Sequence, residues 1–210
     1  MRKTLIALIL GVGFVGAVNA APPQRFHAHL TGGDLAGRTV ATTATGEAQF
    51  EVVEGTKLVN GERVATHALK YRINVAGINN LFQAHIHVSS NPGPIANDQP
   101  VGPVVFWFVP TVPPAQTSPA QALNSNVAER VNGRLADGFV MTDGQLVGPL
   151  ACDDAVAGCS PDTGVAGLIK AIKDGRATVV VHTSDLDNTN NQIPCVAGDS
   201  PPGELRGLIR

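Results

Sequence analysis

Histidine is the residue type whose spacing in this sequence has the clearest chemical meaning. His85 and His87 lie two residues apart in QAHIHV, a segment with the alternating pattern of a β-strand. Side chains at this spacing leave the same face of a strand with Cα atoms about 7 Å apart, so both imidazoles can reach one ion. Such pairs are typical copper or zinc ligands. A third ligand has to come from another strand, and His182 in ATVVVH is the best candidate.

Two further histidines, His27 and His29, repeat this spacing near the start of the chain. They could supply additional ligands if the first strand lies beside the others. The alternative is structural, because a buried imidazole that is hydrogen-bonded to the backbone or to a carboxylate can simply serve the core. The residues alone leave both interpretations open.

The pattern of the other polar residues indicates structural roles. The segment that follows His182 holds several Asp and Asn residues but lacks the glycine and the terminal Glu of a calcium-binding loop, so we interpret it as solvated. Glu204 and Arg206 share one face of the final apolar segment. This placement predicts a partly buried ion pair, or a carboxylate that orients His182 or His85.

Composition and missing motifs exclude several classes of function. With 15 Lys and Arg against 17 Asp and Glu, the net charge is −2, which argues against binding of nucleic acid through phosphate neutralisation. The chain has no G-x-S-x-G, H-E-x-x-H or C-x-x-C motif and no phosphate-binding glycine loop. A non-catalytic protein is therefore favoured over an enzyme.

The elements that must position the histidines have the pattern of β-strands. Apolar residues alternate or run together in short segments that are separated by Gly, Pro, Asn or Asp. These segments are residues 26–30, 48–52, 69–75, 81–88, 104–109, 131–141, 177–182 and 205–209. We therefore expect an all-β sandwich or barrel that forms a single domain over residues 21–210.

One segment has a helical period instead. Apolar residues recur at i, i+3, i+4 and i+7 from Val165 to Ile172, which predicts a short helix over residues 164–173. Thr163 is placed to cap its start and Gly175 to end it. Turns or bulges are predicted at Asn60-Gly61, Asn132-Gly133, Asp137-Gly138 and Asp143-Gly144.

The first twenty residues have the features of a secretory signal peptide. Arg2 and Lys3 precede a short apolar run, and small residues end at Ala20, where we expect cleavage. No other stretch is long enough to span a membrane. The sequence therefore predicts a periplasmic or secreted protein.

Export also determines how the three cysteines are interpreted. An oxidising compartment favours disulfides over thiolate metal sites. Cys152 and Cys159 can close a short loop, which predicts a disulfide between them. A pairing of Cys195 with either of these residues stays open.

Several motifs, taken in order, resemble the CHRD domain. They are FHAHLTG, AHIH, GPVV, VHT and GELRG, and the resemblance extends over nearly all of residues 24–210. Members of that family include secreted bacterial proteins of unestablished activity and repeats of chordin, an extracellular antagonist that binds growth factors. The resemblance implies an immunoglobulin-like, Greek-key β-sandwich with a non-catalytic role. The family's signature positions are His85, His87, His182, Glu204 and Arg206.

A fainter resemblance is to copper/zinc superoxide dismutase. It implies that His85, His87 and His182 stand for copper ligands and Arg206 for a guanidinium that guides the anion. Residues 88–181 contain no histidine, however, so the bridging and zinc-loop ligands have no counterparts.

Two functional hypotheses follow. The first is an exported binding module whose partner is an unidentified extracytoplasmic protein or surface component. The second is a copper- or zinc-binding protein that uses the strand histidines.

Overall fold

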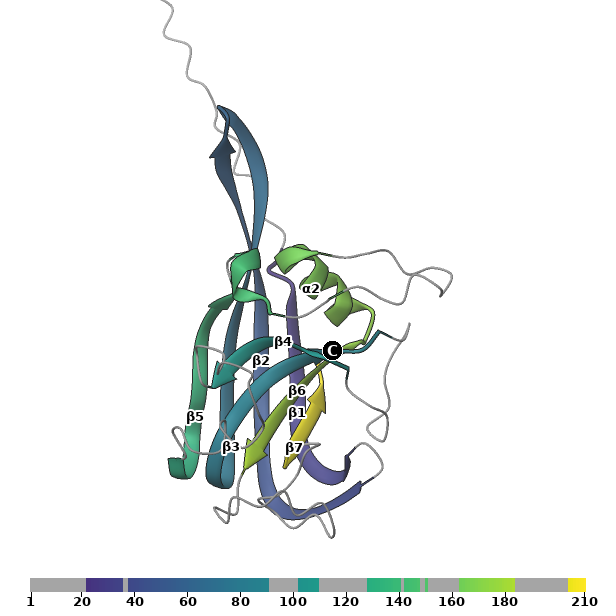
Figure 1. Cartoon of the computed structure of the whole chain (residues 1–210). Coiled ribbons are helices and arrows are strands. Elements are labelled where there is room, and N and C mark those ends of the chain that lie inside the picture. The colour runs from purple at the N-terminus through teal and green to yellow at the C-terminus, as the bar shows by residue number, and fades with distance from the viewer. Residues whose placement is uncertain are drawn as a thin grey trace, which may run out of the picture.

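The fold is built from antiparallel strands with one short helix, which confirms the expected all-β class (Figure 1). A computed structural model describes residues 22–35, 38–90, 102–109, 128–140, 142–147, 150, 163–183 and 204–210. The strands are β1 (Arg25–Leu35), β2 (Arg38–Val59), β3 (Glu62–Val88), β4 (Val104–Val109), β5 (Ala128–Val140), β6 (Ala177–Thr183) and β7 (Leu205–Leu208). A 3₁₀ turn, η1 (Asp143–Gln145), and the helix α2 (Gly164–Lys173) complete the described elements.

The long strand β3 organises the sheet. Its first part pairs with β2, and its last part pairs with β6. Because β2 also pairs with β1, β1 with β7, and β7 with β6, these strands form a continuous circuit. The finer expectation of an immunoglobulin-like or Greek-key sandwich is not confirmed, since the seven strands are linked in one nearly closed, barrel-like sheet.

The two predicted strands 69–75 and 81–88 are one strand in the structure, so their separation was wrong. The interruption between them is a bulge at Gly77, which has a φ of 76° that favours glycine. The Gly77 N–H donates a hydrogen bond of 2.8 Å to the Asn132 side chain on β5. The bulge bends the strand, and β3 then continues to its pairing with β6.

The predicted Asn60-Gly61 turn joins β2 to β3. Both residues have positive φ, 52° and 85°, as the two-residue hairpin turn that matches strand twist requires. From Val53 to Ala68 the two strands form a paired ribbon, which projects beyond the rest of the sheet (Figure 1).

Alternation along the strands divides their side chains between two faces. One face forms the apolar core, in which Ile86 of β3, Phe108 of β4 and Val179 of β6 pack together. Tyr71 packs edge-on against Phe108 with ring centroids 4.9 Å apart. His85 and His87 flank Ile86 and therefore lie on the opposite face.

Helix α2 has the bounds that the sequence predicts, and Gly175, with a φ of 72°, follows its end. Thr163 occupies the predicted N-cap position, but its side chain makes no capping hydrogen bond. Asp143 of η1 caps the helix instead, and its Oδ1 accepts a 3.0 Å hydrogen bond from the Val165 N–H. A Cβ at residue 164 would overlap the Asp143 carboxylate, so Gly164 permits this approach.

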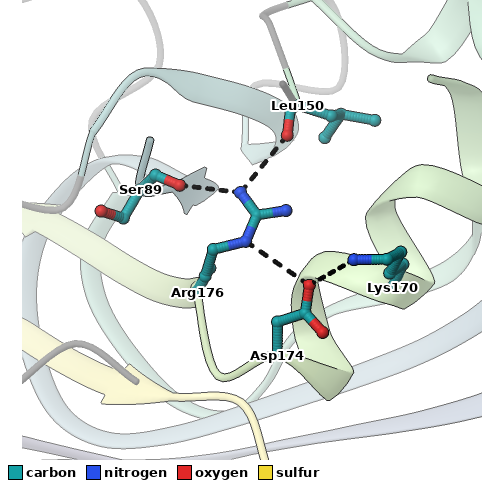
Figure 2. A network of polar contacts seen from close by, with 5 residues as sticks. All are labelled: Ser89, Leu150, Lys170, Asp174 and Arg176. Carbon is teal, nitrogen blue, oxygen red and sulfur yellow. Dashed lines mark hydrogen bonds and ion pairs between the residues drawn. The ribbon is translucent and has the colours of Figure 1, made fainter. Parts of the chain in front are cut away.

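A buried arginine fastens the segment between α2 and β6 to neighbouring chain (Figure 2). Arg176, which is 1% exposed, donates from Nη1 to the carbonyls of Ser89 at 2.9 Å and Leu150 at 3.4 Å. Its Nε lies 3.7 Å from Asp174, whose carboxylate also pairs with Lys170 at 2.7 Å. The network thereby ties the C-terminal end of α2 to the end of β3.

Several predictions fall on residues outside the described ranges. They are the signal peptide over residues 1–20, the Cys152–Cys159 disulfide, the fate of Cys195 and most of the solvated segment that follows His182. Among the described helices, none has the length and apolar character that crossing a membrane requires.

Candidate metal centre

Strand pairing brings the predicted third histidine beside the other two. His85 pairs with Val180 of β6, and His182 lies two residues further along the same strand. Directly paired residues share a face of the sheet, and alternation places His182 on the face of Val180. Two sequence-distant segments thus present three imidazoles on one side of adjacent strands.

The three imidazoles converge. One nitrogen from each of His85, His87 and His182 lies within 4.8 Å of the other two. The ring centroid of His85 is 4.6 Å from that of His87 and 4.7 Å from that of His182. Among the described residues, this is the cluster whose atoms could hold a metal ion.

A backbone carbonyl fixes the tautomer of His87. Its Nδ1 lies 2.7 Å from the carbonyl oxygen of Gly102. Because a carbonyl can only accept, Nδ1 must carry the proton and donate it, which leaves the Nε2 lone pair available. Histidine ligands commonly receive this kind of support from their other ring nitrogen.

Burial and nearby positive charge keep two of the imidazoles neutral. His85 is 2% exposed, and desolvation, followed by the positive charges that His182 and His87 would carry, holds its pKa well below 6.5. Desolvation also lowers the pKa of His87 to about 4, with a further lowering by the Arg206 guanidinium and partial opposition from the Gly102 hydrogen bond. Both rings are therefore neutral at pH 7, as metal ligands must be.

Two of the converging side chains have polar atoms that the fold leaves unsatisfied. Nδ1 of His85 and Nε2 of His87 are buried and have no hydrogen-bond partner in the part of the chain that the structure describes. Buried polar atoms in native proteins are nearly always paired, so each such exception needs an explanation. A ligand seated among the rings would provide one.

The sequence reading missed two residues at this cluster. Trp107 alternates with the core residues Phe106 and Phe108 and pairs with His85, so it lies on the face of the cluster. Its ring lies edge-on to that of His85, with centroids 4.8 Å apart. The position of Trp107 within VVFWFV could have revealed its face, whereas no sequence signal places Gly102 against His87.

Of the other predicted site residues, Arg206 lies near the cluster, because it pairs with Val180 of β6, which also pairs with His85. His27 and His29 are exposed on β1, outside the cluster, and His29 Nδ1 hydrogen-bonds to Glu47. The Glu204 carboxylate accepts a 2.5 Å hydrogen bond from the Thr42 hydroxyl. Its predicted ion pair with Arg206 stays a prediction.

Fold and cluster define an all-β protein with a histidine-lined polar site on the face opposite its core. The CHRD domain model matches residues 26–190, and the chain belongs to that family. The match includes all three clustered histidines and stops before Glu204 and Arg206. Comparison with curated proteins and with solved structures gave no match.

Proposed function

We propose that this CHRD-domain protein is an extracytoplasmic binding module whose ligand is a copper or zinc ion. The ion is held by His85, His87 and His182. Neutral imidazole suits both metals. The observation that carries the proposal is the convergence of three ring nitrogens within 4.8 Å.

The spacing of the nitrogens is close to that of a loaded site. Ligand nitrogens about 2.0–2.1 Å from a tetrahedral zinc lie about 3.4 Å apart. The widest separation in the cluster, at most 4.8 Å, closes to this value if the side chains move by about 1 Å. A small rotation of the rings about their χ angles supplies that movement.

Metal binding also explains why histidine occupies these positions. A ring that only filled space would be better replaced by an apolar side chain, because an unsatisfied buried nitrogen costs about 1–3 kcal/mol. Two such nitrogens belong to the converging side chains of His85 and His87. A metal ion would use the lone pairs that the fold leaves without a donor.

Metal titration of the purified chain tests the proposal, with Trp107 as the reporter. The chain contains one Trp, and its ring lies 4.8 Å from that of His85. We expect copper(II) to quench its fluorescence with a stoichiometry of one ion per chain. His85→Ala and His182→Ala should abolish the tight phase, whereas His29→Ala, which removes an exposed histidine outside the cluster, should retain it.

Metal analysis of the same preparations provides the decisive result. The proposal fails if neither copper nor zinc binds stoichiometrically at micromolar supply, or if His85→Ala and His182→Ala bind as the unchanged chain does. Equal losses in His29→Ala would also contradict it, because they would indicate binding elsewhere.

A second candidate function is docking to an extracytoplasmic protein or surface component. The β2–β3 ribbon favours it, since Leu58, Val59 and Val64 are 71%, 40% and 42% exposed near its tip. Exposed apolar side chains that gather on a projecting element favour protein contact. A chain that takes up no copper or zinc would make this candidate the leading one.

A further inference from the structure

A polar group beside the histidine cluster cannot be satisfied by a metal ion. Trp107 is 5% exposed, and its Nε1–H is buried without a hydrogen-bond partner in the part of the chain that the structure describes. An indole N–H is a donor only and cannot bind a cation. The site therefore needs an acceptor atom in addition to an ion.

A hydroxyl group on the same face of the sheet is also buried and unsatisfied. Thr178 pairs directly with His87, is 0% exposed, and its Oγ1 has no partner among the described residues. Trp107 pairs with His85, so the two unsatisfied groups lie beside neighbouring ligands. Burying two polar groups without partners is costly, and a bound acceptor would relieve such a cost.

The charge of the proposed ligand set indicates what kind of acceptor fits. Three neutral imidazoles leave the full charge of a divalent ion uncompensated, and an uncompensated charge is expensive in a buried site. Catalytic zinc sites with three protein ligands keep a fourth position that water or substrate occupies. A small anion in that position would both offset the charge and accept hydrogen bonds.

We propose that the metal carries a small exchangeable anion as its fourth ligand, and that Trp107 Nε1–H donates a hydrogen bond to it. Thr178 is the second donor. The inference rests on the proposed metal site and adds to it an anion-binding position with its own specificity residues.

Azide binding to the copper(II)-loaded chain tests this position, because azide is a small anion whose coordination changes the copper absorption and electron paramagnetic resonance spectra. We expect saturable binding of one azide per copper. Trp107→Phe keeps an aromatic ring but removes the donor. It should retain one copper per chain and weaken azide by about tenfold, the scale of a lost hydrogen bond to a charged group.

Strand β6 provides a matched pair of variants. Thr178 and Thr183 are both buried with unsatisfied hydroxyls, but Thr183 pairs with Leu81 and lies on the opposite face. Thr178→Val should weaken azide severalfold, whereas Thr183→Val should leave its affinity unchanged. These variants keep the test valid if Trp107→Phe fails to fold.

The possible outcomes distinguish the anion-binding inference from the metal-site proposal on which it rests. A chain that binds copper but shows no spectral response to azide has a closed site, which overturns the anion position and leaves the metal proposal intact. Azide affinity that is equal in the unchanged chain, Trp107→Phe and Thr178→Val overturns the role of these donors. Failure to bind copper at all overturns the metal proposal itself.

Discussion

At the scale of single residues, the cluster depends on imidazoles that the fold keeps neutral. His85 sits between two other histidines and is almost fully buried, so protonating it would place a charge in a poorly solvated position beside two potential charges. The same burial that favours metal binding makes the metal-free protein sensitive to acid.

We expect the metal-free chain to lose stability as the pH falls below 6.5. His85 and His87 have folded-state pKa values below 6.5, and that of His87 is about 4. Between these values the unfolded chain binds more protons, so the free energy of unfolding falls by up to about 1.4 kcal/mol per pH unit for each ring. Above pH 6.5 both states are neutral, and this contribution is flat.

Urea unfolding from pH 7 to pH 5 in the presence of a chelator measures this slope. His85→Gln should reduce the slope to the contribution of His87, because glutamine does not titrate. A free energy of unfolding that stays constant across this window would contradict the assignment of neutral, buried rings.

Gly102 holds His87 in the ligand tautomer, and its substitution should weaken metal binding. It has a φ of 81°, and a Cβ would overlap the backbone of Val88 and Ser89. Gly102→Ala must therefore shift the segment that accepts the His87 hydrogen bond. We expect copper affinity to fall by about 10- to 100-fold, as for other losses of a ligand's hydrogen-bond support.

Gly61→Ala is the control for backbone strain. Gly61 also has positive φ, 85°, but nothing lies within 4 Å of an added Cβ. This variant should lose some stability and keep its copper affinity when both variants are compared by isothermal titration calorimetry. Similar affinity losses in both variants would indicate general destabilisation instead of a specific role for Gly102.

At the scale of elements, sequence periodicity predicted individual helices and strands better than it predicted their contacts with distant parts of the chain. The bounds of α2 and β4 agree with the prediction, because each depends on its own apolar pattern. The length of β3 does not, because the strand continues through the bulge at Gly77, whose N–H donates a hydrogen bond to Asn132, 55 residues away. A bulge within a strand and the end of a strand have the same local sequence signal.

The cap of α2 gives a prediction at this scale. Asp143→Ala removes the acceptor for the Val165 N–H and should destabilise the protein by about 1 kcal/mol. Thr163→Ala should have a much smaller effect, since the Thr163 side chain makes no cap bond. Thermal unfolding of the two variants decides between the caps, and a larger loss for Thr163→Ala would contradict the observed one.

At the scale of the whole molecule, the circuit of strands couples the site to global stability. His85 and His87 lie on β3, which pairs with β2 and β5 as well as with β6, and His182 lies on β6, which also pairs with β7. Unfolding must separate these strands and so must release any bound ion. Ligand binding to the folded state alone therefore stabilises the entire domain.

We expect copper or zinc to raise the melting temperature of the chain. At a free metal concentration 100 times the dissociation constant, the stabilisation is about 2.7 kcal/mol. Scanning calorimetry with and without a chelator measures it. His182→Ala should show no metal-dependent shift, and a shift of the same size in that variant would place the ion elsewhere.

The sequence by itself determined the all-β class, the short helix, the candidate histidines and the resemblance to the CHRD domain. These features are encoded in local alternation and in short motifs that need no knowledge of distant neighbours. Only the tertiary structure decided that His182 joins His85 and His87 while His27 and His29 do not, and that Trp107 and Gly102 contact the cluster. Those facts depend on strand pairing and register, because the register decides which side chains on neighbouring strands meet.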